Sequence, residues 1–282
     1  MKLATINHNH QEQACIVNTE NMTYRPLHVS MQDLIENYGR NGIPESCEGF
    51  YPLNEENLLA PIPYPRRNIL CLGKNYLEHV KEIGGVTGGP KDTAPDYPIY
   101  FTKAAYPCNR HGGTILRHPS VTEKIDYEVE LVVVIGKRAH YIKREDALDY
   151  VFGYTIGNDI SARDVQNRHI NWFMGKSLTT HCPVGPYIVT KDELPDPQNL
   201  SIQSWINDEI RQDGYTGDMI WTVGDIIYEI SQGYELFPGD MIMTGTPKGV
   251  GMGFKPPKFL NPGDKITCKI EKIGTLVNYL EK

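Results

Sequence analysis

The stretch DYEVELVVVIGK, residues 126–137, contains the strongest strand signal of the chain. Its run of β-branched residues is typical of a buried β-strand, and a lysine bounds it at the end. Glu128 and Glu130 are two residues apart, so on a strand their side chains point to the same face. Two carboxylates placed together beside an apolar core repel each other and are costly to desolvate without a cation. We therefore expect this strand to bring two acidic ligands together.

A second strand, VFGYTIGND at residues 151–159, ends at Asp159, which is a third candidate ligand. Three carboxylates without a neighbouring Cys or His suit a hard cation such as Mg²⁺ or Mn²⁺, with Ca²⁺ as a further candidate. The alternative is a solvent-facing strand edge that carries incidental acidic residues. The spacing alone leaves both interpretations open.

Working outward, most other segments also read as short strands that end in Gly, Pro or Asp. Helical patterns are fewer: residues 31–38, 76–83, the segment after Asp159, and 222–232. Strands and helices do not alternate regularly, which counts against a doubly wound sheet and favours a β-rich α+β fold. The proline-rich connector at residues 60–65 interrupts regular structure. It predicts a small N-terminal α+β domain at residues 1–62 and a main domain at residues 66–282.

The composition excludes several classes of function. A formal net charge of −7 disfavours nucleic acids and anionic membranes as partners. The six cysteines include no C-x-x-C pair, which argues against a zinc cluster and favours scattered reduced thiols. The N-terminus lacks the apolar core of a signal peptide, and the apolar run at residues 131–135 is too short to span a bilayer. We expect a cytoplasmic protein.

Two segments after Asp159 offer groups for an anionic substrate. On a helix that begins near Ser161, Arg163 and Gln166 are neighbours and present a guanidinium and an amide to a carboxylate. An ordinary surface helix is the alternative. Lys176 lies in a G-K-S string, but a phosphate-binding loop needs Gly at position 170, where this chain has Ile. Nucleotide binding is therefore not supported, and an isolated lysine is most often solvated.

His79 and Glu82 are three residues apart in a helical pattern, so the carboxylate can orient the imidazole for general-base catalysis. The spacing H-x-x-E also recurs by chance. Further along, the segment TGTPKGVG at residues 244–251 follows an apolar strand. Its glycines permit close approach of a ligand to main-chain donors. Because prolines rather than a helix follow it, a dinucleotide-binding motif is excluded.

Taken together, these motifs resemble the fumarylacetoacetate hydrolase family. The resemblance covers residues 66–282 and runs in the family's order. The quoted segments are DYEVELVVVIGK, DYVFGYTIGNDISARDVQ, the G-K-S element, CPVGPYIV, PGDMIMTGTPKGVG and IGTLVN. It is closest to a bacterial branch that includes oxaloacetate decarboxylases. The fold implied is a mixed β-sandwich roll, commonly assembled as a homodimer.

The resemblance also implies roles for individual residues. Glu128, Glu130 and Asp159 match the metal triad; His79 and Glu82 match a dyad that some members carry on a mobile lid; Lys176 matches a lysine beside the substrate; Arg163, Gln166 and Thr246 match substrate-contacting positions. The stretch from Gly84 to Pro98 is a candidate lid hinge, with an ordinary surface loop as the default.

The implied activity is divalent-metal-dependent cleavage of a C–C bond in a small anionic 2-keto acid. Decarboxylation of oxaloacetate to pyruvate and CO₂, through a metal-stabilised enolate, is the leading expectation. In acylpyruvate hydrolysis, the second candidate, His79 and Glu82 activate water. Isomerisation of a 5-carboxymethyl-2-hydroxymuconate-type substrate is third. A non-catalytic scaffold is the contrasting class, which the complete set of site residues disfavours.

Overall fold

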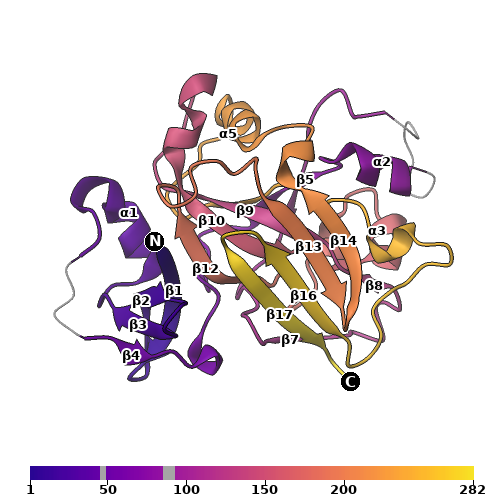
Figure 1. The fold of residues 1–282 in the computed structure, drawn as a ribbon. Coiled ribbons are helices and arrows are strands. Elements are labelled where there is room, and N and C mark those ends of the chain that lie inside the picture. Colours follow the sequence, from indigo (N-terminus) through magenta and orange to yellow (C-terminus); the bar gives the residue numbers. More distant parts are fainter. Residues whose placement is uncertain (45–48, 85–92) are drawn as a thin grey trace.

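The computed structural model describes residues 1–44, 49–84 and 93–282 of the chain (Figure 1). In chain order its elements are β1 (Lys2–His8), β2 (Gln11–Asn18), β3 (Thr23–Pro26), α1 (Met31–Asn41), β4 (Tyr51–Pro52), η1 (Glu55–Asn57), β5 (Ile69–Gly73), α2 (Leu77–Ile83), β6 (Ile99–Lys103), β7 (Thr114–Ile115), β8 (Ile125–Asp126), β9 (Val129–Ile135), η2 (Arg144–Tyr150), β10 (Val151–Asn158), β11 (Ser161–Ala162), α3 (Arg163–Arg168), α4 (Phe173–Lys176), β12 (Val184–Thr190), β13 (Ser201–Ile206), β14 (Glu209–Tyr215), η3 (Thr216–Asp218), α5 (Val223–Ser231), β15 (Met241–Met243), η4 (Gly251–Gly253), β16 (Lys265–Ile270) and β17 (Gly274–Leu280).

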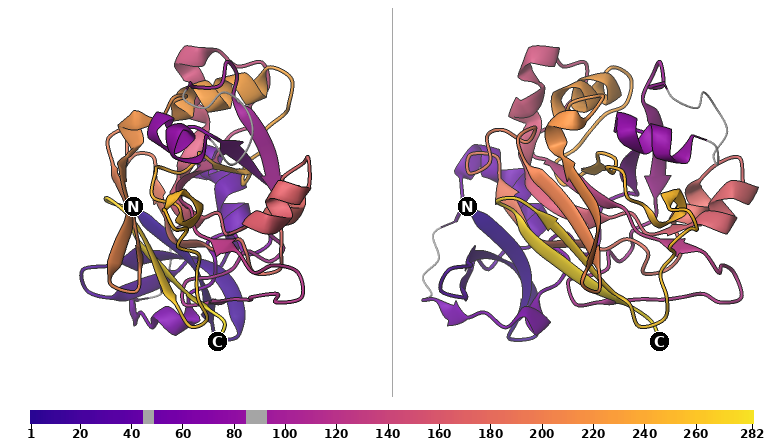
Figure 2. Two further views of the ribbon diagram at one scale, coloured as in Figure 1. Left: turned by 90° about the vertical axis from the view of Figure 1, so that its right-hand side faces the viewer. Right: turned by 45° about the vertical axis from the view of Figure 1, so that its right-hand side comes forward.

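Two sheets form the body of the molecule. A mixed ten-stranded sheet has the order β4-β3-β2-β1-β12-β10-β9-β15-β5-β6, and a second sheet has the order β14-β13-β16-β17-β7. Strands β13 and β16 of the second sheet contact β9, and β17 contacts β10 and β12. The second sheet therefore covers the centre of the first, as the two views of Figure 2 show. The expected β-rich α+β sandwich is confirmed.

Strand β9 is apolar on both faces because each face meets a different core. Leu131 and Val133 belong to the core between the two sheets. Val132 and Val134 belong to a second core on the opposite face, which includes residues of α1. Glu130 precedes Val132 by two residues, so it lies on the face of the second core. The alternation of side chains along β9 therefore places the carboxylate of Glu130 in the buried layer beside the second core.

The N-terminal strands continue the large sheet. β1 pairs antiparallel with β12, with Lys2 opposite Val189 and Leu3 opposite Ile188. Strands β1 to β4 form one side of the molecule in Figure 1. The predicted division into domains at residues 1–62 and 66–282 stays a prediction.

Several local expectations differ from the structure. The helix expected to begin near Ser161 begins instead at Arg163, because Ser161 and Ala162 pair with β8. Strands β14 and β17 were not expected. The burial pattern of β14 is irregular and mostly exposed, because it lies at the edge of the second sheet, so it lacks a clear period of two.

The described part of the chain also bears on the cysteines and on membranes. Its five cysteines, Cys15, Cys71, Cys108, Cys182 and Cys268, are free and buried. None of the helices formed by residues 1–44, 49–84 and 93–282 has the length and apolar character needed to cross a bilayer.

Candidate metal centre and active site

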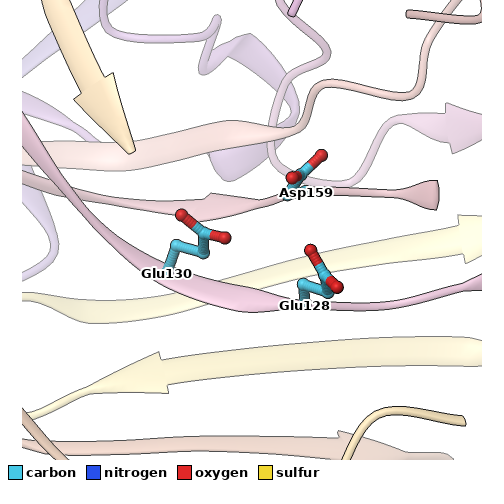
Figure 3. A group of neighbouring side chains, drawn as sticks. All are labelled: Glu128, Glu130 and Asp159. Atoms are coloured by element: carbon cyan, nitrogen blue, oxygen red, sulfur yellow. The ribbon is translucent and has the colours of Figure 1, made fainter. Parts of the chain in front are cut away.

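Glu128, Glu130 and Asp159 converge at one end of the large sheet (Figure 3). Glu128 immediately precedes β9, Glu130 lies within it, and Asp159 immediately follows β10. The two strands are antiparallel neighbours, with Glu130 opposite Gly157. One carboxylate oxygen from each residue lies within 4.8 Å of the other two, and all three residues are buried. The predicted convergence of the three side chains is therefore present.

Glu128 is held between two cations. Arg163 Nη2 lies 2.6 Å from its Oε1, and Lys176 Nζ lies 2.6 Å from its Oε2. Burial opposes ionisation of this carboxyl group, but Arg163 and Lys176 outweigh that effect and hold the pKa of Glu128 below its usual range. Glu128 is consequently a carboxylate in the folded protein.

Glu130 has the opposite environment. The backbone N–H of Gly245 donates to its Oε2 at 2.8 Å. Burial, followed by the neighbouring carboxylates of Asp159 and Glu128, raises the pKa of Glu130 well above its usual range. A buried carboxyl group in this position becomes an effective ligand when additional positive charge is brought beside it.

The buried groups around the triad carry unequal charge. When all are ionised, four carboxylates face three cations, so one negative charge is left uncompensated. These groups are Asp126, Glu128, Glu130 and Asp159 with Lys103, Arg163 and Lys176. Oxygen donors with surplus negative charge are the set that Mg²⁺, Mn²⁺ or Ca²⁺ prefers. The residues present therefore fit a divalent cation.

Lys176 links two of the three acidic residues. Its Nζ donates to Glu128 Oε2 at 2.6 Å and to Asp159 Oδ2 at 2.7 Å. Burial disfavours its charge, but Asp159 and Glu128 together raise the pKa of Lys176 above its usual value. The ring of Phe101 lies 5.3 Å from the ammonium group. Lys176 is thus a buried cation at the triad, whereas an isolated lysine is usually solvated.

Lys103, at the end of β6, was missed by the sequence reasoning. It is fully buried, and its Nζ lies 2.7 Å from Asp159 Oδ1. The same ammonium group donates to the backbone carbonyls of Ile160 and Lys176. In the sequence, a lysine at the end of a half-buried strand gives only a weak signal, because its partner Asp159 lies 56 residues further along the chain.

Arg163 and Gln166 do lie on one helical face, as predicted. Arg163 Nη1 donates to Gln166 Oε1 at 3.0 Å, while Nε donates to Asp126 Oδ2 at 2.8 Å. With Nη2 bound to Glu128, the guanidinium fork is occupied by residues of the chain itself. Its binding of substrate, like that of Gln166, stays a prediction.

Asp126 is a second residue that the sequence reasoning missed. It is fully buried, and besides Arg163 it accepts the backbone N–H groups of Gly251 at 2.6 Å and Met252 at 3.0 Å. The signal was available, because Asp126, Glu128 and Glu130 continue one two-residue spacing. Asp126 ties the helix that carries Arg163 to the glycine-rich segment.

The segment at residues 244–253 donates backbone N–H groups to acidic side chains of the chain itself, and the approach of a ligand to its glycines stays a prediction. Gly245 donates to Glu130, and Gly249 donates to Glu82 Oε1 at 2.9 Å. Gly249 has a φ of +107°, and a Cβ there would lie 1.9 Å from the carbonyl oxygen of Arg211. A side chain at this position would therefore displace the segment that orients Glu82.

His79 and Glu82 lie together on α2. His79 Nδ1 is 3.3 Å from Glu82 Oε2, and His79 is only 4% exposed. Met252 and Val250 pack with Ile83 at the end of this helix. The predicted hinge from Gly84 to Pro98 includes residues 85–92, which lie outside the described residues.

Most of the candidate site residues line one cavity. Its empty volume is about 400 Å³, including the part open to solvent. Thr246 also lines it, although its hydroxyl donates to Val129 O at 2.9 Å and accepts from Gln212 at 2.7 Å. The lining consists of Leu72, Gly73, Lys74, His79, Ile83, Phe101, Glu128, Glu130, Arg163, Gln166, Trp172, Lys176 and Thr246.

We expect Asp126→Asn to lower the free energy of unfolding by about 3 kcal/mol, because it removes a buried anion that compensates Arg163. Chemical denaturation monitored by circular dichroism measures this loss. Asp146→Asn, at an exposed position of η2, is the matched control and should change stability by less than about 0.5 kcal/mol. Equal stability of both variants would show that Asp126 does not support the site.

A strand-rich sandwich fold that brings a buried carboxylate triad and a histidine to one cavity is the arrangement of an enzyme site. The model of the family "Fumarylacetoacetate (FAA) hydrolase C-terminal" matches residues 68–281. The chain belongs to this family, whose members are hydrolases, isomerases and tautomerases that typically bind a divalent metal. It is therefore an enzyme that metabolises a small keto acid.

Individual relatives agree with this assignment. The chain is 49% identical over 230 residues to oxaloacetate tautomerase YisK of Bacillus subtilis, covering 82% of this chain and 75% of that protein. The solved fumarylacetoacetate hydrolase of Exiguobacterium antarcticum is 35% identical with a TM-score of 0.84, covering 100% of this chain and 99% of the other. A 2-hydroxyhepta-2,4-diene-1,7-dioate isomerase of Mycobacterium marinum is 32% identical with a TM-score of 0.78, covering 100% and 98%.

Proposed function

We propose that the protein catalyses proton transfer between the keto and enol forms of oxaloacetate. The observation that carries this proposal is the position of His79, which lines the same cavity as Glu128, Glu130 and Lys176. A relative with 49% identity bears the name oxaloacetate tautomerase, which supports the same substrate. Tautomerisation needs a base at C3 and stabilisation of negative charge at the C2 oxygen, and the cavity contains groups for both.

His79 supplies the base in this proposal. Its Nδ1 faces Glu82, so the other ring nitrogen is left to take the proton from C3 and to deliver it to the C2 oxygen when the enol forms; the reverse transfers restore the keto form. Glu82 is held by the N–H of Gly249 and stabilises the imidazolium that forms. A divalent cation held by the carboxylate triad supplies positive charge that favours the enolate.

Lys176 supplies a second stabilising charge. Its ammonium group contacts the carboxylate of Glu128 and lines the cavity. There it donates a hydrogen bond to the negative charge that develops on the C2 oxygen of the substrate. The apolar side chains of Leu72, Ile83 and Phe101 limit the access of water to this charge.

Decarboxylation of oxaloacetate, the leading expectation from the sequence, is the second candidate. It passes through the same enolate and draws on the same stabilising charges. The apolar part of the cavity favours departure of uncharged CO₂. It does not require a base, however, so it leaves His79 and Glu82 without a role until the enolate is protonated. Acylpyruvate hydrolysis and dienoate isomerisation remain further candidates.

The deciding experiment follows oxaloacetate with the protein and Mn²⁺ present and, as the control, with the same Mn²⁺ and no protein; a further sample contains the protein and excess chelator. We expect faster interconversion of the enol and keto forms, read by ultraviolet absorbance, together with hydrogen–deuterium exchange at C3. Pyruvate should form no faster than in the control. Rapid pyruvate formation would select decarboxylation instead, and the absence of any metal-dependent change would overturn both candidates.

The remaining assignments are proposals as well. We propose Mg²⁺ or Mn²⁺ as the native cation, with Ca²⁺ as a further candidate, because the donors are all carboxylate oxygens. The homodimeric assembly and the cytoplasmic location stay predictions.

A further inference from the structure

Trp172 lies one helical turn before Lys176 at the cavity. The backbone N–H of Lys176 donates to Trp172 O at 3.1 Å, so the two residues share one face of the turn. Both side chains line the cavity. The turn packs tightly on α3, because a Cβ on Gly175 would lie 2.5 Å from the backbone nitrogen of Gln166. The turn that brings the Lys176 ammonium group to the triad therefore also places an indole ring in the cavity wall.

The indole packs against two neighbouring strands of the large sheet. Gly73 ends β5, and a Cβ there would lie 2.5 Å from Cζ3 of the Trp172 ring. Phe101 of β6 packs edge to face against the same ring, with ring centroids 5.4 Å apart. β5 and β6 are antiparallel, with Gly73 opposite Ile99. The ring therefore covers the end of this strand pair that contains Gly73.

This end of the strand pair faces the cavity from the side opposite the triad. In the sheet, β15 lies between β5 and β9, the strand that carries Glu130. Met243 of β15 is opposite both Val132 of β9 and Cys71 of β5, so Glu130 and Gly73 lie at the same end of the sheet. Neighbouring strands are about 4.8 Å apart, which separates the two backbones by about 10 Å. The cavity thus extends from the carboxylates toward the indole.

The aromatic side chains begin close to the charged groups. The Phe101 ring centroid lies 5.3 Å from Nζ of Lys176, and this ammonium group lies 2.6 Å from Glu128 Oε2. Three C–C bonds of about 1.5 Å give an extended four-carbon acid a length of about 4 Å from C1 to C4. A four-carbon acid bound at the triad therefore reaches the aromatic wall, and a longer tail collides with it.

Trp172 also separates the cavity from solvent. It is half-buried, whereas the next two residues, Phe173 and Met174, are 36% and 49% exposed. One side of this turn therefore faces the cavity and the other side faces solvent. Removal of the indole should open the cavity at this end rather than leave a closed void.

We propose that Trp172 sets the upper limit on substrate size, so that the site accepts 2-keto acids of three or four carbons and excludes those with a bulky tail. This inference rests on the proposed function, because it concerns the tail of the substrate whose keto acid group lies at the triad. It favours oxaloacetate over acylpyruvates with large acyl groups.

The test measures binding rather than turnover, with Mg²⁺ present. Oxamate and N-benzyloxamate are unreactive analogues that share a carboxylate beside a carbonyl group and differ in the bulk of the tail. Titration calorimetry should show that the wild-type protein binds oxamate more tightly. In Trp172→Ala, the ratio of the two affinities should shift by about 10-fold or more toward N-benzyloxamate, because the steric conflict is removed. Trp172→Phe keeps part of the wall and should shift the ratio less.

Phe173→Ala is the matched control. Phe173 is the next aromatic residue of the chain, and it is not among the described residues that line the cavity. Its removal takes away a ring of similar apolar character from the solvent-facing side of the turn. The ratio should therefore stay within about twofold of the wild-type value.

Four outcomes would overturn the inference: an unchanged ratio in Trp172→Ala, an equal shift in Phe173→Ala, equal affinities of the wild type for both analogues, or loss of oxamate binding in Trp172→Ala. The last outcome would show that the ring supports the whole site rather than its size limit. A shifted ratio in Trp172→Ala, without tautomerisation of oxaloacetate by the wild type, would instead refute only the proposed function.

Discussion

Glu130→Gln is expected to lower kcat by about 1000-fold or more and to weaken Mg²⁺ or Mn²⁺ binding by at least about 100-fold. The substitution preserves shape but removes one of the three carboxylates that we propose as metal ligands. Burial and the neighbouring acids raise the pKa of Glu130, so a charged carboxylate at this position destabilises the metal-free protein and a neutral amide does not. We therefore expect its thermal stability without metal to be unchanged or slightly raised. Calorimetric metal titration, steady-state kinetics and thermal melting measure the three quantities.

Glu145→Gln is the control for this variant, because Glu145 is exposed on η2, away from the cavity. It should bind metal and turn over substrate as the wild type does. Glu130→Gln protein that kept its metal affinity would contradict the assignment of the triad. If metal affinity fell together with a large loss of thermal stability, the role of Glu130 would be structural.

His79→Asn is expected to lower the rate of C3 proton exchange by about 10²- to 10⁴-fold, the usual contribution of a general base. Metal affinity should change little, because the histidine is not one of the three carboxylates that we propose as ligands. The measurement is hydrogen–deuterium exchange at C3 of oxaloacetate, with metal affinity determined on the same sample.

The neighbouring residue provides the control. Glu78 is adjacent in sequence but pairs with Lys81 at the surface, so Glu78→Gln should exchange normally. Full exchange activity in His79→Asn would refute proton transfer by this histidine. It would leave decarboxylation, which needs no base, as the better candidate.

Much of the site could be predicted from short-range patterns. The two-residue spacing of Glu128 and Glu130 predicted that their side chains share one face of a strand. The position of Asp159 at the end of a second apolar strand predicted a third carboxylate beside them. The His79 and Glu82 pair follows from helical spacing, and the structure places the two side chains together. Even here the extent of β9 was overestimated, because Glu128 lies between β8 and β9 rather than within a continuous strand.

The parts that could not be predicted depend on long-range contacts. Lys103 and Asp159 form a buried ion pair although 56 positions separate them in the chain. The N–H groups of the glycine-rich segment bind Glu82, Asp126 and Glu130, which lie between 115 and 167 positions away in the chain. Nothing local in either segment specifies these partners.

The sequence by itself determined the local placement of the site's side chains. Two carboxylates have the two-residue spacing of a strand, a histidine and a glutamate have helical spacing, and the motifs resemble one enzyme family. Local geometry is sufficient for this, because strand and helix periods are fixed by the backbone. Only the tertiary structure decided how the charges are distributed. The packing of β9 against β10 and of α3 and α4 around them makes Glu128 an anion held by two cations and leaves Glu130 with surplus negative charge around it. The pKa of each group depends on its burial and on nearby charges, and these come from residues throughout the chain. The folded structure is therefore needed to determine them.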